Sequence, residues 1–238
     1  PVIVAIGGEP DDGVTADATP TVGGTGPAGE TVIVYNNGVE LGRVVVSNVG
    51  EWTFTLPAQS DGPVNVTVAA VDDAGNVSDL SPVFTVTIDT TPPAVPQIND
   101  VSDSQLTNGT LYTRDGTPTL TGTGEPGSTV IVSVDGAPSG APVTVQPDGT
   151  WSWTAGSALS DAPHEFTVSS RDPVGNTSDS SAPLSVTVDT IDPTAPTGIS
   201  VAAQGTPMTG SAESGVTITV TDADGNVLGT GVATGGSF

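Results

Sequence analysis

The stretch TPTVGGTG at residues 19–26 is the natural starting point, because the chain repeats it. The same stretch returns as TPTLTGTG at 117–124 and, in looser form, as TPMTG at 206–210. The period is about 100 residues, which is the size of a small domain rather than of a solenoid unit. The sequence therefore predicts a tandem of similar domains, an organisation that acts mainly through length, stiffness and number.

Two further signatures recur at the same period. GEWTF at 50–54 is matched by GTWSW at 149–153, and DDAGNVS at 72–78 is matched by DPVGNTS at 172–178. The tryptophan-bearing segments supply bulky side chains for a core. A domain of about 100 residues is large enough to bury such a core.

Apolar and polar residues alternate along most of the apolar segments. Val64, Val66 and Val68 share one face of such a segment, while Asn65 and Thr67 share the other. A period of two, rich in Val, Ile and Thr, is typical of half-buried strands. Asn-Gly and Asp-Gly turns separate these segments by about 8–12 residues. The expected fold is all-β, with tandem immunoglobulin-like antiparallel β-sandwiches arranged end to end.

Short proline-bearing links end the first two repeats. They read TIDTTPP at 87–93 and TVDTIDP at 187–193, and neither contains a Gly/Ser spacer. Proline keeps such a link extended, so neighbouring domains are expected to sit end to end at short range. The predicted units are domain 1 at 1–91, domain 2 at 92–191 and a partial, truncated domain 3 at 192–238.

The charge balance is strongly acidic. The chain has 27 acidic side chains against three basic ones, for a formal net charge of −24. Such a chain repels nucleic-acid phosphates and anionic membranes, which argues against both as direct partners. Cysteine is absent, and no apolar run approaches the roughly 18 residues that span a bilayer. Metal cations are the natural counterions, and calcium is the cation that hard carboxylate oxygens favour.

A calcium site is expected at the junction between domains 1 and 2. In an immunoglobulin-like strand order, the B–C and F–G loops lie where the chain enters a domain, next to the exit of the preceding domain. Asp89 in the link, Glu125 in the B–C loop and Asp172 in the F–G loop should therefore converge. Such carboxylates repel one another unless a cation lies among them. Asp189 and Glu213 would repeat this arrangement at the second junction.

Other acidic residues fit either a metal site or ordinary loop structure. Asp72 is the F–G acid of domain 1, but Asp-x-x-Gly-Asn is also a common tight-turn sequence in which Asp bonds its own backbone. Loops between strands A and B hold a second acidic group, which predicts either a further cation site or a solvated surface. Its members are Asp11, Asp12 and Asp17 in domain 1 and Asp100, Asp103 and Asp115 in domain 2.

Catalytic chemistry has little support. His164 is the single histidine and aligns with Val64, so no Ser-His-Asp arrangement belongs to the repeating unit; a surface or strand-start histidine is expected. DADGN at 222–226 resembles the start of a calcium loop, but Ala233 stands where that loop needs an acid. A plain hairpin turn is expected there, and the protein is predicted not to be an enzyme.

The combined signatures resemble the bacterial immunoglobulin-like repeats of giant adhesins, including biofilm-associated proteins. Gram-negative bacteria export these adhesins by type I secretion. The resemblance covers essentially the whole chain. It implies a secreted, non-enzymatic stalk at the bacterial cell surface, associated with the outer membrane and serving adhesion or biofilm formation. Calcium would stiffen the junctions between neighbouring repeats, and another region would bind the host or surface ligand.

The resemblance also assigns metal ligands by position. Pro27 of domain 1 departs from the pattern, with Glu30 nearby, and this puts the site of domain 1 in doubt. The implied residues are the linker acids Asp89 and Asp189, the loop acids Asp72 and Asp172, and the acids Glu125 and Glu213 that follow the Gly-Thr-Gly segment.

Two other functions stay open at the level of sequence. The domains could themselves bind a carbohydrate or receptor, which exposed aromatics would favour, although Tyr35 and Tyr112 are the only tyrosines. They could also be accessory domains of a secreted glycosidase, which only flanking sequence would distinguish.

Overall fold

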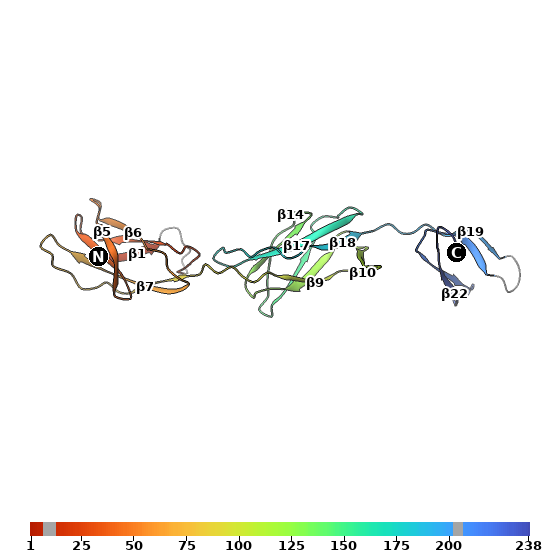
Figure 1. Ribbon diagram of the computed structural model, residues 1–238, viewed down its shortest axis with the longest axis horizontal. Helices are drawn as coiled ribbons and strands as arrows, with labels where there is room; N and C mark the ends of the chain where they lie inside the picture. The colour runs from red at the N-terminus through yellow and green to blue at the C-terminus, as the bar shows by residue number, and fades with distance from the viewer. Residues whose placement is uncertain (7–12, 202–206) are drawn as a thin grey trace.

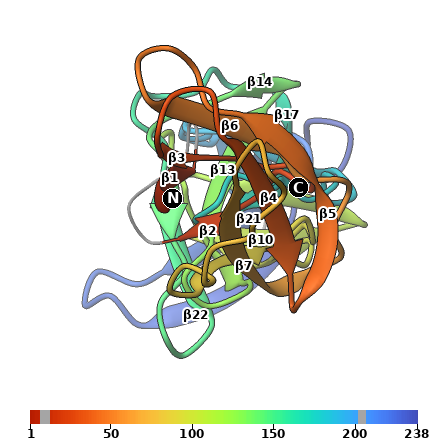
Figure 2. The same ribbon diagram turned by 90° about the vertical axis from the view of Figure 1, so that its left-hand side faces the viewer.

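The computed structural model describes residues 1–6, 13–201 and 207–238, and every regular element in these ranges is a β-strand. The all-β prediction is confirmed. No helix in the described ranges is long and apolar enough to cross a membrane. Three groups of strands follow one another along the long axis of the molecule (Figure 1), and Figure 2 looks along that axis from the first group.

The first group is a sandwich of two sheets. Its strands are β1 (Val2–Ile6), β2 (Val14–Thr15), β3 (Thr21–Thr25), β4 (Thr31–Asn36), β5 (Val39–Val45), β6 (Glu51–Thr55), β7 (Gly62–Val71) and β8 (Phe84–Ile88). One sheet has the order β1-β3-β6 and the other has the order β2-β8-β7-β4-β5. The pairings are antiparallel except that β2 runs parallel to β8. This edge pairing departs from the purely antiparallel expectation, because the chain leaves the first sheet after β1 and joins the second sheet at β2.

The second group repeats this plan. Its strands are β9 (Gln97–Val101), β10 (Ser104–Thr107), β11 (Thr110–Thr113), β12 (Thr119–Thr123), β13 (Thr129–Val134), β14 (Ala137–Pro138), β15 (Val143–Thr144), β16 (Thr150–Thr154), β17 (Pro163–Arg171) and β18 (Leu184–Val188). One sheet has the order β16-β12-β9. The other has the order β10-β11-β18-β17-β13-β14, with β15 also paired to β13 and with β11 parallel to β18. The sequence repeat therefore corresponds to a repeated sandwich.

The third group consists of two strand pairs. β19 (Thr197–Val201) pairs with β20 (Met208–Ser211), and β21 (Thr217–Thr221) pairs with β22 (Val227–Val232). Within the segment that joins β21 to β22, Asp222 Oδ1 accepts the backbone N–H groups of Asp224 and Asn226 at 3.0 and 2.8 Å. The plain turn predicted for residues 222–226 is confirmed.

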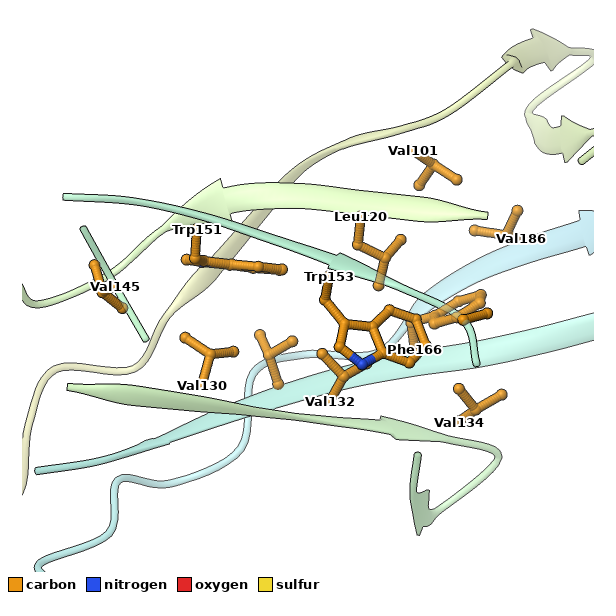
Figure 3. Close-up of a cluster of buried hydrophobic side chains, with 12 residues drawn as sticks. Val101, Leu120, Val130, Val132, Val134, Val145, Trp151, Trp153, Phe166 and Val186 are labelled. Carbon is orange, nitrogen blue, oxygen red and sulfur yellow. The ribbon is translucent and has the colours of Figure 1, made fainter. Parts of the chain in front are cut away.

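Each complete sandwich closes on a core that contains tryptophan. In the second sandwich, Trp151 and Trp153 of β16 are each 3% exposed. They pack with Phe166 of β17 and with Val130 and Val132 of β13, which belong to the opposite sheet (Figure 3). Large aromatic side chains bury about 150–250 Å² each, so each of them fills more of this core than any of the valines around it. The predicted role of the tryptophan-bearing segment is confirmed.

Tryptophan packing also explains the glycine of the repeated Gly-Thr-Gly segment. A Cβ on Gly122 would collide with the carbonyl oxygen of Gln97 on β9 and lie 2.5 Å from the ring of Trp151. Gly24 stands in the same relation to Trp52 in the first sandwich. The segment therefore repeats because only glycine leaves room for the indole ring and the neighbouring strand.

Candidate functional site: the domain junctions

The exit of the first sandwich is fixed by an aspartate from the turn before β7. The Asp61 carboxylate accepts the backbone N–H of Thr90 at 2.9 Å and its hydroxyl at 2.7 Å, and it also accepts the Thr91 hydroxyl. These hydrogen bonds, that of the Thr91 hydroxyl first, hold the pKa of Asp61 below its ordinary value. Asp89 N–H donates to the Thr15 carbonyl at 2.8 Å. The linker therefore leaves the sandwich in a fixed direction.

The exit of the second sandwich is built in the same way. Asp161 Oδ1 accepts the backbone N–H of Thr190 at 2.8 Å and its hydroxyl at 2.9 Å, and Asp189 N–H donates to the Thr113 carbonyl at 2.9 Å. Sequence reasoning missed this role and treated Asp61-Gly62 as a turn signal only. The available signal was the recurrence of Ser-Asp-x-Pro at 60–63 and 160–163.

The first linker docks on the N-terminal face of the second sandwich, which we define as its B–C loop (124–128), its F–G loop (172–183) and the adjoining Ser170. Asn176 Nδ2 donates to the backbone oxygen of Asp89 at 2.8 Å. The backbone N–H of Ala94 donates to Glu125 Oε2 at 3.1 Å, and the Ser170 hydroxyl donates to the Ala94 carbonyl at 2.9 Å. The linker is thus bonded to three separate side chains of the next domain.

Pro93 and Pro96, at the end of the first linker, are buried, whereas Pro92 and the prolines of the second linker are exposed. Pro96 packs close to the second sandwich, since a Cβ on Gly124 would be in contact with its side chain at 3.5 Å. In the second linker, residues 191–200 are exposed throughout. Among the described residues, no hydrogen bond joins 189–196 to the third group. The first and second linkers, although similar in sequence, therefore have different surroundings. Figure 1 shows the second linker as a long extended segment without regular secondary structure.

The F–G carboxylates are bonded by their own loops. Asp172 Oδ1 accepts the N–H groups of Gly175 and Asn176 at 2.6 and 2.8 Å, and Oδ2 accepts Asn176 Nδ2 at 2.8 Å. Asp72 makes the corresponding bonds with Asn76, which come first among the causes that lower the pKa of Asp72. This is the tight-turn arrangement that was one of the two interpretations of Asp-x-x-Gly-Asn.

The structure brings Asp89, Glu125 and Asp172 to one junction, but it connects them through backbone groups and Asn176. Asp89 Oδ1 itself accepts the Thr91 N–H at 3.2 Å. No group of three or more His, Cys, Asp or Glu side chains that could hold a metal ion occurs in the described part of the chain. The donors are hard oxygens, which suit calcium, but their arrangement is not that of a ready-made site. The calcium ligand set stays a prediction.

Two of the acids predicted as metal ligands, one from the A–B loop and one from the second linker, lie around an open cavity at the second junction. Asp103 and Asp189 line it together with Arg114, Ser214 and Gly215. Arg114 approaches Asp103 at 3.9 Å, and both side chains are largely exposed, so this ion pair contributes little. The cavity lies between the exit end of the second sandwich and the loop of the third group that contains Ser214 and Gly215.

The other predicted acids occupy separate places. Asp100 is exposed on β9, and Glu213 is exposed in the loop between β20 and β21. Asp115 caps its own turn by accepting the Ser102 hydroxyl at 2.9 Å and the Thr117 N–H at 2.8 Å. Asp17 accepts the Thr19 N–H at 2.8 Å in the same way. Asp11 and Asp12 lie outside the described residues.

His164 is not a surface residue. It lies at the start of β17, as expected, but is 8% exposed. Its Nδ1 lies 2.7 Å from Asp135 Oδ2 and its Nε2 lies 3.0 Å from the Ser160 carbonyl oxygen. Burial lowers the pKa of the imidazole, but the hydrogen bonds to Asp135 and Ser160 outweigh burial and raise it above 6.5. The histidine therefore ties a hairpin turn to the turn that anchors the second linker.

Comparison with known proteins agrees with this architecture. Models of the bacterial Ig-like domain match residues 5–90 and 91–190, and a model of the bacterial Ig domain matches residues 192–238. The chain therefore belongs to the bacterial immunoglobulin-like domain family. Among curated proteins, none matches the sequence.

Several solved structures are similar to the chain. A Ca²⁺-stabilized adhesin that helps an Antarctic bacterium to bind ice is 24% identical, with a TM-score of 0.47 over 100% of this chain and 64% of that chain. A 1.5-MDa bacterial ice-binding adhesin is 27% identical, with a TM-score of 0.41 over 79% of this chain and 65% of that chain. Fibronectin(III)-like modules of Clostridium thermocellum CbhA are 18% identical, with a TM-score of 0.46 over 77% and 93%. This chain therefore spans just under two thirds of each adhesin structure.

Proposed function

We propose that the chain is a stalk segment of a large bacterial surface adhesin, which presents a distal binding domain in adhesion or biofilm formation. The docked first linker is the observation that carries the proposal. Three hydrogen bonds join the linker to the second sandwich, and Pro93 and Pro96 are buried, so the junction resists bending. A spacer needs such junctions, because its reach depends on keeping successive domains in line.

A non-catalytic role is part of the proposal. The acids that could act as proton donors or acceptors in the loops are bonded as turn caps, as at Asp72, Asp115 and Asp172. His164 and Asp135 hold two turns together inside the second sandwich. Bacterial Ig-like domains generally serve as structural modules, and we expect this segment to lie outside the cell, at the bacterial surface.

We also propose that calcium binds at the junctions and adds to their stiffness. The support is chemical, namely carboxylate and carbonyl oxygens at both junctions in a chain of net charge −24. The effect should be larger at the second junction, where the linker is exposed. The residues that would hold the ion at the first junction are Asp89, Glu125 and Asp172. Asp189 and Glu213 would hold it at the second junction, where Asp103 lines the same cavity as Asp189. Asp72 at the N-terminal face of the first sandwich and Asp100 on β9 would serve further sites.

Small-angle scattering of residues 1–238 tests the stalk and the calcium effect together. An end-to-end array gives an elongated profile in chelator, and calcium should lengthen its maximum dimension by straightening the second junction. A compact, folded-back profile in both conditions would contradict the stalk. Identical elongated profiles would contradict only the calcium proposal. Binding of the chain to glycans on an array would instead favour a carbohydrate-binding module.

A further inference from the structure

The Asn176 side chain bonds to both sides of the first junction. An amide nitrogen carries two hydrogens. Nδ2 of Asn176 donates to Asp172 Oδ2 within its own loop and to the backbone oxygen of Asp89 in the linker, both at 2.8 Å. Asp172 is itself held by the N–H groups of Gly175 and Asn176. The amide therefore reaches the linker from a loop whose shape is already fixed.

Ala94 provides a second attachment, five residues further along the linker. Its N–H donates to Glu125 and its carbonyl accepts from Ser170, so both of its polar backbone groups are satisfied by the next domain. Ser170 is fully buried. Since the backbone is held at Asp89 and again at Ala94, the linker can neither swing nor rotate freely between these points.

These contacts are not a general property of the fold. In the first sandwich, Asn76 Nδ2 donates to Asp72. Pro27 stands at the position of Glu125, and Ala70 stands at the position of Ser170. The N-terminal face of the first sandwich therefore lacks two of the three side chains that hold the linker on the second.

We propose that Glu125, Ser170 and Asn176 form a linker clamp that fixes the first junction without any metal ion. The partner that the clamp recognises is the backbone of an extended, proline-bearing linker that leaves the preceding domain at an Asp-Thr pair. The proposal rests on the stalk function and specifies how one of its junctions is made stiff. A domain with all three residues docks its predecessor, and a domain with Pro and Ala at the first two positions does not.

The clamp holds the junction in the absence of a metal ion, and a calcium ion at this junction would share two carboxylates with the clamp, those of Glu125 and Asp172. N–H donors occupy lone pairs on the Asp89 carbonyl, on Glu125 and on Asp172. A cation would add to this arrangement only if it drew the remaining carboxylate oxygens toward one point, which the clamp does not require. Replacing Glu125 by Gln separates the two accounts, because Gln keeps an oxygen that accepts the Ala94 N–H but removes the charge that favours calcium.

Distances between spin labels in the two domains test the clamp. The chain has no cysteine, so Thr53→Cys and Ser152→Cys place labels at exposed, equivalent positions on β6 and β16. Distance distributions are recorded in chelator and in millimolar calcium, for the otherwise unchanged chain and for the single variants Asn176→Ala, Ser170→Ala, Glu125→Gln and Asn76→Ala. The last is the matched control, because Asn76 belongs to the same loop motif without a linker on it.

The clamp predicts a narrow distribution in chelator for the unchanged chain, for Glu125→Gln and for Asn76→Ala. Asn176→Ala and Ser170→Ala should broaden it, with the undocked population rising roughly 2- to 10-fold for each hydrogen bond lost. Ser170→Ala keeps the test valid if Asn176→Ala disturbs its loop, because Ala70 occupies the same position in the first sandwich. A distribution that is narrow only with calcium, or unchanged in both clamp variants, overturns the clamp but leaves the stalk intact. A broad distribution in both conditions overturns both proposals.

Discussion

The repeated Gly-Thr-Gly segment makes the sharpest prediction about stability. Gly122→Ala adds a single methyl group at the centre of the second sandwich. That methyl would collide with the carbonyl oxygen of Gln97 and lie 2.5 Å from the Trp151 ring. Because the obstacle includes backbone of a paired strand, neither neighbour can move without breaking the β9–β12 pairing or the core.

The expected cost follows from overpacking. An added methyl in a filled core costs about 1–3 kcal/mol, and a collision with backbone places this site at the upper end. The reduced freedom of the unfolded chain returns about 0.4–1 kcal/mol. A net loss of about 2 kcal/mol lowers the melting temperature of a domain of this size by roughly 8–16 °C.

Thermal unfolding followed by tryptophan fluorescence measures this loss, since Trp151 and Trp153 both report on the second core. Gly156→Ala is the matched control, because a Cβ on Gly156 meets no atom within 4 Å. It should melt within a few degrees of the unchanged chain. A Gly122→Ala variant that melts together with this control would refute the packing explanation of the motif.

Three further predictions concern charge. The raised pKa of His164 stabilises the second sandwich fully below pH 6.5, and this contribution is lost as the pH rises through the folded-state pKa. Calorimetry at a series of pH values should show the loss as a lower melting temperature. His164→Val, which copies Val64, should abolish this pH dependence. The lowered pKa of Asp61 stabilises the first sandwich above pH 3.8, and this contribution is lost as the pH falls through the folded-state pKa. Asp61→Asn should remove this pH dependence in the same calorimetric titration. It should also speed hydrogen exchange of the backbone amides at the exit of the first sandwich. Calcium at about 100-fold excess over Kd should add about 2.7 kcal/mol per site to the free energy of unfolding, even in high sodium chloride. An unchanged melting temperature would show that the acids are only a solvated surface. Asp89→Ala should weaken calcium binding while leaving the circular dichroism spectrum native-like.

The fold could be predicted because its signals are local and repeated. Alternation along 64–68 and the paired tryptophan segments each specify one strand, and the period specifies one domain. The parallel pairing of β2 with β8 has no such signal, because it depends on where the chain crosses between sheets. The burial of His164 was missed for a similar reason, since its partner Asp135 lies on a hairpin 29 residues away.

The junction was predictable in position but not in chemistry. Strand order alone assigns Asp89, Glu125 and Asp172 to the same junction, because the exit of one sandwich meets the loops of the next. The donor from which each carboxylate accepts a hydrogen bond depends on the path of the linker backbone. That path is set by the Asp61 cap and by buried Pro93, and neither residue type signals a partner on the other side of a junction. Asn176 was therefore read as a turn residue rather than as a bridge.

Residual dipolar couplings test the stiffness of the first junction most directly, because they report the orientation of each domain independently. Couplings from residues 13–88 and 97–188, measured in chelator, should fit one common alignment tensor if the docked linker holds the two sandwiches as one body. Two tensors of clearly different magnitude would show that the domains reorient independently, and would contradict the account of this chain as a stiff, end-to-end stalk.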